Sequence, residues 1–226
     1  MRPITLTITL ALLAATNTQA AQTNNAAGDY PSKPIRLIVP FAPGGGTDLT
    51  ARAIALKLTE AWGQTVVPDN RAGANGTIAV DIATKSVPDG YTLTMISSSH
   101  SVNSSLYKNL SYDLTRDLAP IAMYASVPYL LVVHPSLPAY SVKELVALAR
   151  ARPRELTWSV ASILGGGRIA GELFREAAHI ELINVPYGGG GPATIALLGG
   201  HTSMMVGNVL ECSPYLASGR MRAIAV

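Results

Sequence analysis

Three glycine-rich loops are the segments of this sequence whose residue types suggest ligand-binding chemistry. They span residues 44–48, 165–167 and 188–191, and each follows an apolar, strand-like run and precedes a helical pattern. The first backbone N–H groups of a helix have no partner within the helix and lie at the positive end of its dipole. Because glycine lets a ligand come close to the backbone, the loops predict an anion-binding site, unless they only form tight turns. Thr47 adds a hydroxyl donor, whereas Asp48 is expected to stabilise its own helix terminus.

The third loop leaves a second interpretation open, that of a dinucleotide-dependent enzyme. Gly188, Gly190 and Ala193 match the pattern G-x-G-x-x-A after a strand, and Glu211 follows at about the position of a ribose-binding acid. Runs of glycine also satisfy this pattern by chance, and the first loop lacks the Gly-Lys-Ser/Thr ending of a P-loop. A dinucleotide is therefore the alternative ligand rather than the expected one.

Side-chain groupings for catalysis or metal binding are sparse. The sequence has no G-x-S-x-G motif, and its histidines lack metal-ligand spacing. These histidines are His100, His134, His179 and His201. Asp113 and Asp117 lie where capping explains them, and the single cysteine, Cys212, is expected to be a buried apolar residue. We therefore predict no catalytic residues, no metal and no cofactor, and a protein that is not an enzyme.

Strand and helix patterns alternate along the chain. Apolar, β-branched runs predict strands at residues 35–39, 65–68, 91–96, 127–133, 156–160, 180–185, 203–209 and 222–226. Helical spacing predicts helices at residues 49–62, 78–85, 141–151, 165–178 and 192–198. Ser141 is the expected N-cap of the third helix. Such alternation predicts an α/β fold with a mostly parallel sheet covered by helices on both faces, and with ligands at the carboxyl ends of its strands.

The first twenty residues differ from the rest of the chain. Arg2 precedes an almost wholly apolar stretch at residues 4–15, and Ala20 ends the segment with a small residue. This pattern is typical of a secretory signal peptide at residues 1–20, which a polar spacer at residues 21–30 follows. We therefore expect export to the periplasm.

The composition allows a folded globular protein without a strongly electrostatic partner. Hydrophobic residues make up 48% of the 226 residues, enough for a substantial core, and charged residues make up 14% with a net charge of +3. Since the charges form no runs, no nucleic-acid partner is predicted. The last predicted strand reaches Val226, the final residue, so we expect a C-terminally truncated chain.

Several ordered motifs resemble one known family. The run from Tyr30 to Asp48 (YPSKPIRLIVPFAPGGGTD) is similar to the opening of the Bug family of periplasmic solute receptors, the substrate-binding components of tripartite tricarboxylate transporters. Agreement continues at residues 70–77, 88–93, 185–192, 197–200 and 219–226. The resemblance implies a type II periplasmic binding protein with two α/β lobes. Lobe 1, at residues 31–127, is expected to be incomplete because its C-terminal returning segment is missing, and lobe 2 spans residues 128–226.

The resemblance also implies which residues line the cleft between the lobes. They are Phe41, Ala42, Pro43, Gly44, Gly45, Gly46, Thr47, Asp48, Gly76, Thr77, Ser98, Ser99, Tyr187, Gly188, Gly189, Gly190 and Asn208. The chain departs from the family pattern at residues 160–165, where Ile163 and Leu164 stand instead of small polar residues. This departure favours a more apolar or aromatic acid, for which Arg168 is either a carboxylate partner or only a solvated helix residue.

We therefore expect a monomeric periplasmic receptor that captures one small organic acid, either a di- or tricarboxylate or an aromatic or apolar carboxylate. Backbone N–H groups and hydroxyls hold this ligand, and no bond is made or broken. The implied partners are the membrane permease subunits of a tripartite tricarboxylate transporter. A receptor that presents its ligand to a sensor protein is the remaining alternative.

Overall fold

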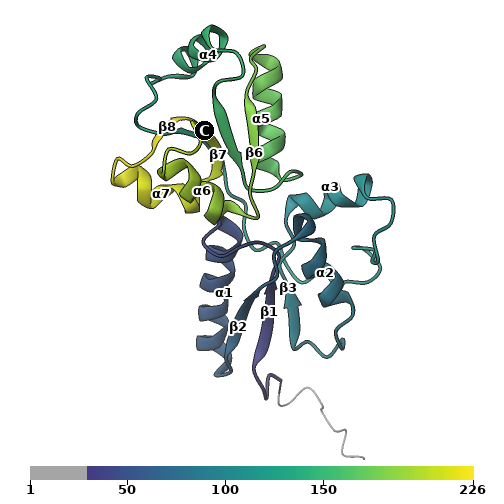
Figure 1. The fold of residues 1–226 in the computed structure, drawn as a ribbon. Coiled ribbons are helices and arrows are strands. Elements are labelled where there is room, and N and C mark those ends of the chain that lie inside the picture. Colours follow the sequence, from purple (N-terminus) through teal and green to yellow (C-terminus); the bar gives the residue numbers. More distant parts are fainter. Residues whose placement is uncertain (1–29) are drawn as a thin grey trace, which may run out of the picture. The chain divides into compact units, whose positions relative to one another are not determined.

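The computed structural model describes residues 30–226, whose strands form two β-sheets (Figure 1). The predicted signal peptide at residues 1–20 lies outside the described residues, as does the predicted spacer except for Tyr30. Among the helices that are described, none combines the length and the apolar composition that crossing a membrane requires.

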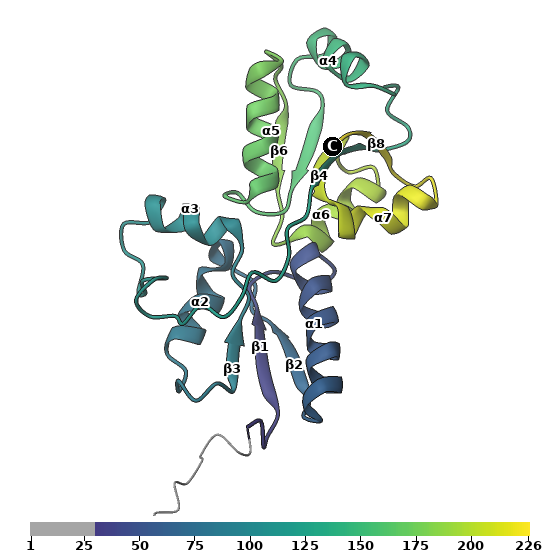
Figure 2. The same cartoon turned by 180° about the vertical axis from the view of Figure 1, so that it is seen from behind.

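A three-stranded parallel sheet comes first in the chain. Its strands are β1 (Ile35–Val39), β2 (Val66–Asn70) and β3 (Thr92–Thr94), in the order β2-β1-β3. Its helices are α1 (Gly46–Trp62), the short 3-10 helix η1 (Ala74–Gly76), α2 (Thr77–Thr84) and α3 (Ser98–Leu106). Alternate residues of β1 (Ile35, Leu37 and Val39) pack on Ala51 and Ala55 of α1. Figure 1 and Figure 2 show α2 on the other side of this sheet.

A five-stranded mixed sheet follows. Its strands are β4 (Tyr129–Val133), β5 (Thr157–Val160), β6 (Ile183–Pro186), β7 (Met204–Asn208) and β8 (Arg222–Ala225), in the order β6-β5-β7-β4-β8. Its helices are α4 (Val142–Ala151), α5 (Gly166–Ala177), α6 (Gly190–Leu198) and α7 (Val209–Ala217). Strand β5 runs parallel to β6 and β7, whereas β4 runs antiparallel to β7 and β8.

Strand β4 divides the core of the five-stranded sheet into two layers. Leu131 and Val133 pack with residues of α4 and α5, whereas Leu130 and Val132 pack with residues of α6 and α7. Successive side chains of a strand point to opposite faces, so a strand that is apolar on both faces must be covered on both. The unbroken apolar run of β4 therefore positions α6 and α7 on one face, and their N-terminal ends contribute to the site described below.

The structure confirms the predicted α/β fold class, but the expectation of a mostly parallel sheet fails for β4. An apolar run predicts burial on both faces and carries no information on strand direction, which depends on the edge from which the chain enters the sheet. Ser141 is confirmed as the N-cap of α4, since its Oγ accepts a hydrogen bond from the Glu144 N–H at 3.2 Å. The lobe boundaries at residues 127 and 128 stay a prediction.

The sequence patterns do not predict two helices, α3 and α7. Helix α3 is rich in serine, a weak helix former, and it begins with reciprocal capping between Ser97 and His100. Helix α7 contains Pro214, and it begins with a capping box between Asn208 and Glu211. In both cases the start of the helix is fixed by side-chain caps rather than by apolar spacing, and both starts lie at the candidate site.

Candidate ligand-binding site

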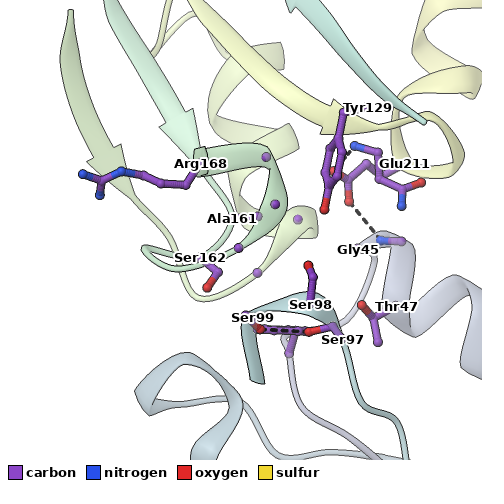
Figure 3. Close-up of a pocket in the computed structure, with 18 of the residues that line it drawn as sticks. Gly45, Thr47, Ser97, Ser98, Ser99, Tyr129, Ala161, Ser162, Arg168 and Glu211 are labelled. Atoms are coloured by element: carbon purple, nitrogen blue, oxygen red, sulfur yellow. Dashed lines mark hydrogen bonds between the residues drawn. The ribbon is translucent and has the colours of Figure 1, made fainter. Parts of the chain in front are cut away.

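A pocket lies where the N-terminal ends of five helices meet (Figure 3). Its lining residues come from the starts of α1, α3, α5, α6 and α7, together with strands β4 and β7. They are Phe41, Gly45, Gly46, Thr47, Ser97, Ser98, Ser99, Tyr129, Ala161, Ser162, Gly165, Gly166, Gly167, Arg168, Gly189, Gly190, Val206, Asn208 and Glu211. The helix starts follow the carboxyl ends of strands, which is the edge where α/β sheets bind ligands.

Two of the glycine-rich loops pack directly against each other at one end of the pocket. The Ala42 N–H donates to the Gly188 carbonyl at 3.2 Å. A Cβ at Gly45 would lie 3.0 Å from the Gly190 nitrogen, and a Cβ at Gly191 would overlap the Pro43 carbonyl oxygen. Glycine is therefore needed here because two backbones approach each other, which is a use that the sequence does not distinguish from ligand binding.

The carboxylate of Glu211 occupies the start of α1. Its Oε2 accepts a hydrogen bond from the Gly46 N–H at 2.9 Å, and its Oε1 accepts one from the Asn208 N–H at 2.9 Å. The side chain also lies against α6, since a Cβ at Gly190 would overlap Oε2. One buried carboxylate thus accepts N–H groups at the starts of α1 and α7 and lies against the start of α6, the kind of position that favours an anion.

Burial raises the pKa of the Glu211 carboxyl above its ordinary value, while the two backbone hydrogen bonds act in the opposite direction. The neighbouring Asn208 completes the cap, because its Oδ1 accepts a hydrogen bond from the Leu210 N–H at 2.8 Å. The motif Asn208-Val-Leu-Glu211 has the spacing of a capping box, and this is the signal from which the sequence could have yielded α7.

The other end of the pocket is lined by hydroxyls and by the start of α5. The Ser162 Oγ lies 3.3 Å from the Asn75 Oδ1, and the Ser97 and Ser99 hydroxyls are 2.8 Å apart. In the part of the chain that the structure describes, no acidic side chain accepts a hydrogen bond from a backbone N–H group in the first turn of α5. This end therefore has helix N–H groups that can donate to an anion, whereas the Ser162 hydroxyl already donates to Asn75.

Tyr129 stands between the two ends (Figure 3). Its ring lies against Gly166 and Gly167, where a Cβ would come within about 3 Å of it. Burial and, to a smaller extent, the negative charge of Glu211 raise the pKa of the Tyr129 hydroxyl, while hydrogen bonds with the Ser98 side chain and the Gly167 backbone lower it. The hydroxyl therefore links the start of α3 to the start of α5.

Arg168 lines the pocket but its charge is paired elsewhere. Its Nη2 lies 2.8 Å from the Glu172 Oε1, one helical turn along α5, and Figure 3 shows the side chain extending away from Ser98 and Tyr129. Of the two interpretations of this residue, a solvated helix residue fits the geometry.

Ile163 is 42% exposed and, like Leu164, does not line the pocket. Ile163 and Leu164 thus do not contribute to the preference for a more apolar or aromatic acid, which stays a prediction.

The structure brings together about half of the residues predicted to bind the ligand, which are the cleft residues implied by the resemblance and Arg168. Those that line the pocket are Phe41, Gly45, Gly46, Thr47, Ser98, Ser99, Arg168, Gly189, Gly190 and Asn208. Those that do not are Ala42, Pro43, Gly44, Asp48, Gly76, Thr77, Tyr187 and Gly188. The residues of the second group instead make contacts within the protein that shape the loops.

Each residue of the second group has a structural partner. Asp48 is buried and accepts hydrogen bonds from the Gly44 N–H at 3.0 Å and from Arg52, as expected for a group that stabilises its own helix terminus. The Thr77 hydroxyl donates to the Ala74 carbonyl at 3.0 Å, and Tyr187 packs on the apolar layer beneath α6. The lining also includes Gly165, Gly166 and Gly167 of the second glycine-rich loop, which the sequence patterns predict as part of an anion-binding site. The lining residues that the sequence patterns do not yield are Ser97, Tyr129, Ala161, Ser162, Val206 and Glu211 as a pocket residue.

The geometry does not support the dinucleotide interpretation of the loop at residues 188–191. Its acid, Glu211, uses both carboxylate oxygens to accept backbone N–H groups at the starts of α1 and α7. A ribose-binding acid must instead present its oxygens to two sugar hydroxyls. Gly190 and Gly191 meet Glu211 and Pro43 rather than open space for a pyrophosphate.

The protein has two sheets flanked by helices, and the N-termini of these helices surround a pocket. This is the architecture of the periplasmic solute-binding proteins. Residues 50–226 match the family described as the tripartite tricarboxylate transporter family receptor. The chain belongs to this family, as the resemblance of its motifs to the Bug receptors implies.

Similar proteins of known name or structure support this assignment. Protein BugT of Bordetella pertussis is 40% identical over 202 residues, which cover 88% of this chain and 62% of BugT. The structure titled R. palustris Rpa4515 with adipate superposes with a TM-score of 0.84 at 38% identity, and that of the periplasmic binding protein BugD with a TM-score of 0.82 at 32% identity. Each of these two matches covers 87% of this chain and 66% of the other. The chain thus spans about two thirds of the length of the proteins it resembles.

Proposed function

We propose that the protein captures a small carboxylated organic anion in the periplasm and delivers it to the membrane subunits of a tripartite tricarboxylate-type transporter. The observation that carries this proposal is the convergence of five helix N-termini on one pocket. Such ends attract anions because their N–H groups lack partners inside the helix and carry partial positive charge. Membership of a receptor family and the adipate named with Rpa4515 support the class of ligand and of partner.

The pocket suits binding rather than reaction. The end of the pocket at α5 offers backbone N–H groups of the first turn of α5, which hydrogen-bond an anion without changing it, and the Ser98 and Ser162 side chains lie beside them. Cys212, next to Glu211, is buried, and its raised pKa keeps it a thiol. We therefore infer that the ligand carboxylate lies at the start of α5, between α3 and the loop that contains Ser162.

Calorimetric titration tests this function directly. The protein expressed from its full reading frame is titrated with a panel of mono-, di- and tricarboxylates, and with the neutral diamide of each diacid as the matched control. At least one carboxylate is expected to bind with micromolar affinity, and at one hundred times its Kd it is expected to stabilise the fold by about 2.7 kcal/mol. A protein that binds no member of the panel, or binds the neutral diamides equally well, contradicts the proposal.

A further inference from the structure

We propose that Glu211 sets the charge of the ligand by filling one of the two anion positions of the pocket with a carboxylate that belongs to the protein itself. The ligand then carries a single carboxylate at the α5 end, and a neutral hydrogen-bond donor at the end that faces Glu211. This inference rests on the proposed function and specifies which organic anions the site accepts.

Several features of the structure hold the Glu211 carboxylate in its position. The residue is only 5% exposed, yet it lines the pocket, and each of its oxygens holds a backbone N–H at 2.9 Å. Gly190 lacks a side chain at the point where a Cβ would overlap Oε2, so the α6 loop leaves room for this carboxylate. Three helix N-termini therefore meet a protein carboxylate where the sequence patterns alone predict a ligand anion.

No cation in the pocket offsets this charge. Among the described lining residues, the charged side chains are Glu211 and Arg168, and the Arg168 guanidinium is held by Glu172 at 2.8 Å. Both oxygens of Glu211 accept backbone N–H groups, which favours the ionised carboxylate against the opposing effect of burial. A second ligand carboxylate near Glu211 would then face a like charge in a partly desolvated site, where screening by water is weak. Such repulsion disfavours a dianion relative to a monoanion of the same shape.

A hydrogen-bond donor of the ligand that lies near Glu211 can bond to its carboxylate oxygens. A carboxylate oxygen has two lone-pair sites, and each oxygen of Glu211 accepts one described hydrogen bond. An amide N–H₂ or a hydroxyl group of the ligand can therefore donate to Glu211. Asn208 and Thr47, which line the pocket beside it, add neutral polar contacts.

Matched pairs of ligands test the inference on the wild-type protein. Succinate and adipate are each compared with their monoamides, succinamate and adipamate, which keep the shape but carry one charge less. Titration calorimetry at pH 7.5 is expected to show tighter binding of the monoamide by about tenfold or more within the pair that fits the pocket. Equal affinities, or a preference for the dicarboxylate, overturn the inference.

A substitution locates the effect on one residue. Glu211→Gln removes the charge and keeps the size, so the preference for the monoamide is expected to fall to within about twofold. Glu176→Gln is the control because it removes the same charge at a residue that is exposed on α5 and does not line the pocket. An unchanged ligand preference in Glu211→Gln overturns the inference.

The outcomes separate this inference from the function on which it rests. If Glu211→Gln does not fold, the preference of the wild-type protein between the paired ligands still decides. Failure of every carboxylate and monoamide to bind overturns the proposed function and the inference together. Binding of dicarboxylates as tightly as monoamides overturns the inference alone.

Discussion

The two ends of the pocket are built from the same element, a glycine-rich turn from a strand into a helix, but they differ in what occupies it. At the α1 end, the Gly46 N–H is bonded to Glu211. At the α5 end, the first turn meets the Tyr129 ring and an array of serine hydroxyls. At the α1 end a protein carboxylate accepts the helix N–H group, and at the α5 end no protein carboxylate takes that place.

This difference shows that a glycine-rich turn is not by itself a ligand site. The loops at residues 41–48 and 188–191 use their glycines to approach each other and to leave space for Glu211. The loop at residues 165–167 uses them to accommodate Tyr129 and Val206. What a loop binds is therefore decided by the residue that reaches it from elsewhere in the chain.

The largest expected effect concerns the reactivity of Cys212, which neighbours Glu211 at the α1 end of the pocket. Burial, together with the nearby charge of Glu211, raises the pKa of this thiol from 9.0 to about 12. Because the thiolate is the reactive form, alkylation by iodoacetamide at pH 8 is expected to be about a thousandfold slower than in the urea-unfolded protein. Mass spectrometry over time measures both rates. Rates that agree within tenfold would show that this end of the pocket opens readily.

A substitution of Gly190 is expected to have the next largest effect. A Cβ at this position would overlap Glu211 Oε2, so Gly190→Ala is expected to lower the free energy of unfolding by about 3 kcal/mol through overpacking and lost hydrogen bonds. Gly188→Ala is the control, since a Cβ there meets nothing within 4 Å and is expected to change stability by less than about 0.5 kcal/mol. Urea denaturation compares them, and equal losses would contradict the assigned role of Gly190.

The smallest expected effect concerns the α5 end of the pocket. Ser98→Ala removes one hydroxyl from the pocket, so the Kd of the tightest carboxylate in the titration panel is expected to rise about fivefold, or about 1 kcal/mol. The melting temperature is expected to fall only slightly, because the Ser98 side chain also hydrogen-bonds Tyr129. Ser101→Ala, on an exposed position of α3 outside the lining, serves as the matched control. An unchanged Kd in Ser98→Ala would mean that the ligand does not reach this end.

The fold was largely predictable because its signals are local. Residues such as Ile35 to Val39 form an unbroken β-branched run, and the turn that follows contains glycines and leads into a helical pattern. The starts of α3 and α7 were harder to predict because they depend on side-chain caps, one of which pairs His100 with the Ser97 N–H. Caps of this kind are visible as motifs, but they compete with the weak helix propensity of serine and with Pro214.

By itself the sequence determined the alternation of strands and helices, the positions of the glycine-rich turns and the family to which the chain belongs, since all of these are patterns of neighbouring residues. Only the tertiary structure decided that Glu211, 165 residues away along the chain, bonds to the Gly46 N–H, and that Arg168 turns to Glu172. Such contacts depend on how the sheets and loops pack in space, and local residue spacing does not encode that packing. The chemistry of the pocket is thus set by a long-range contact, although the elements that form it are local.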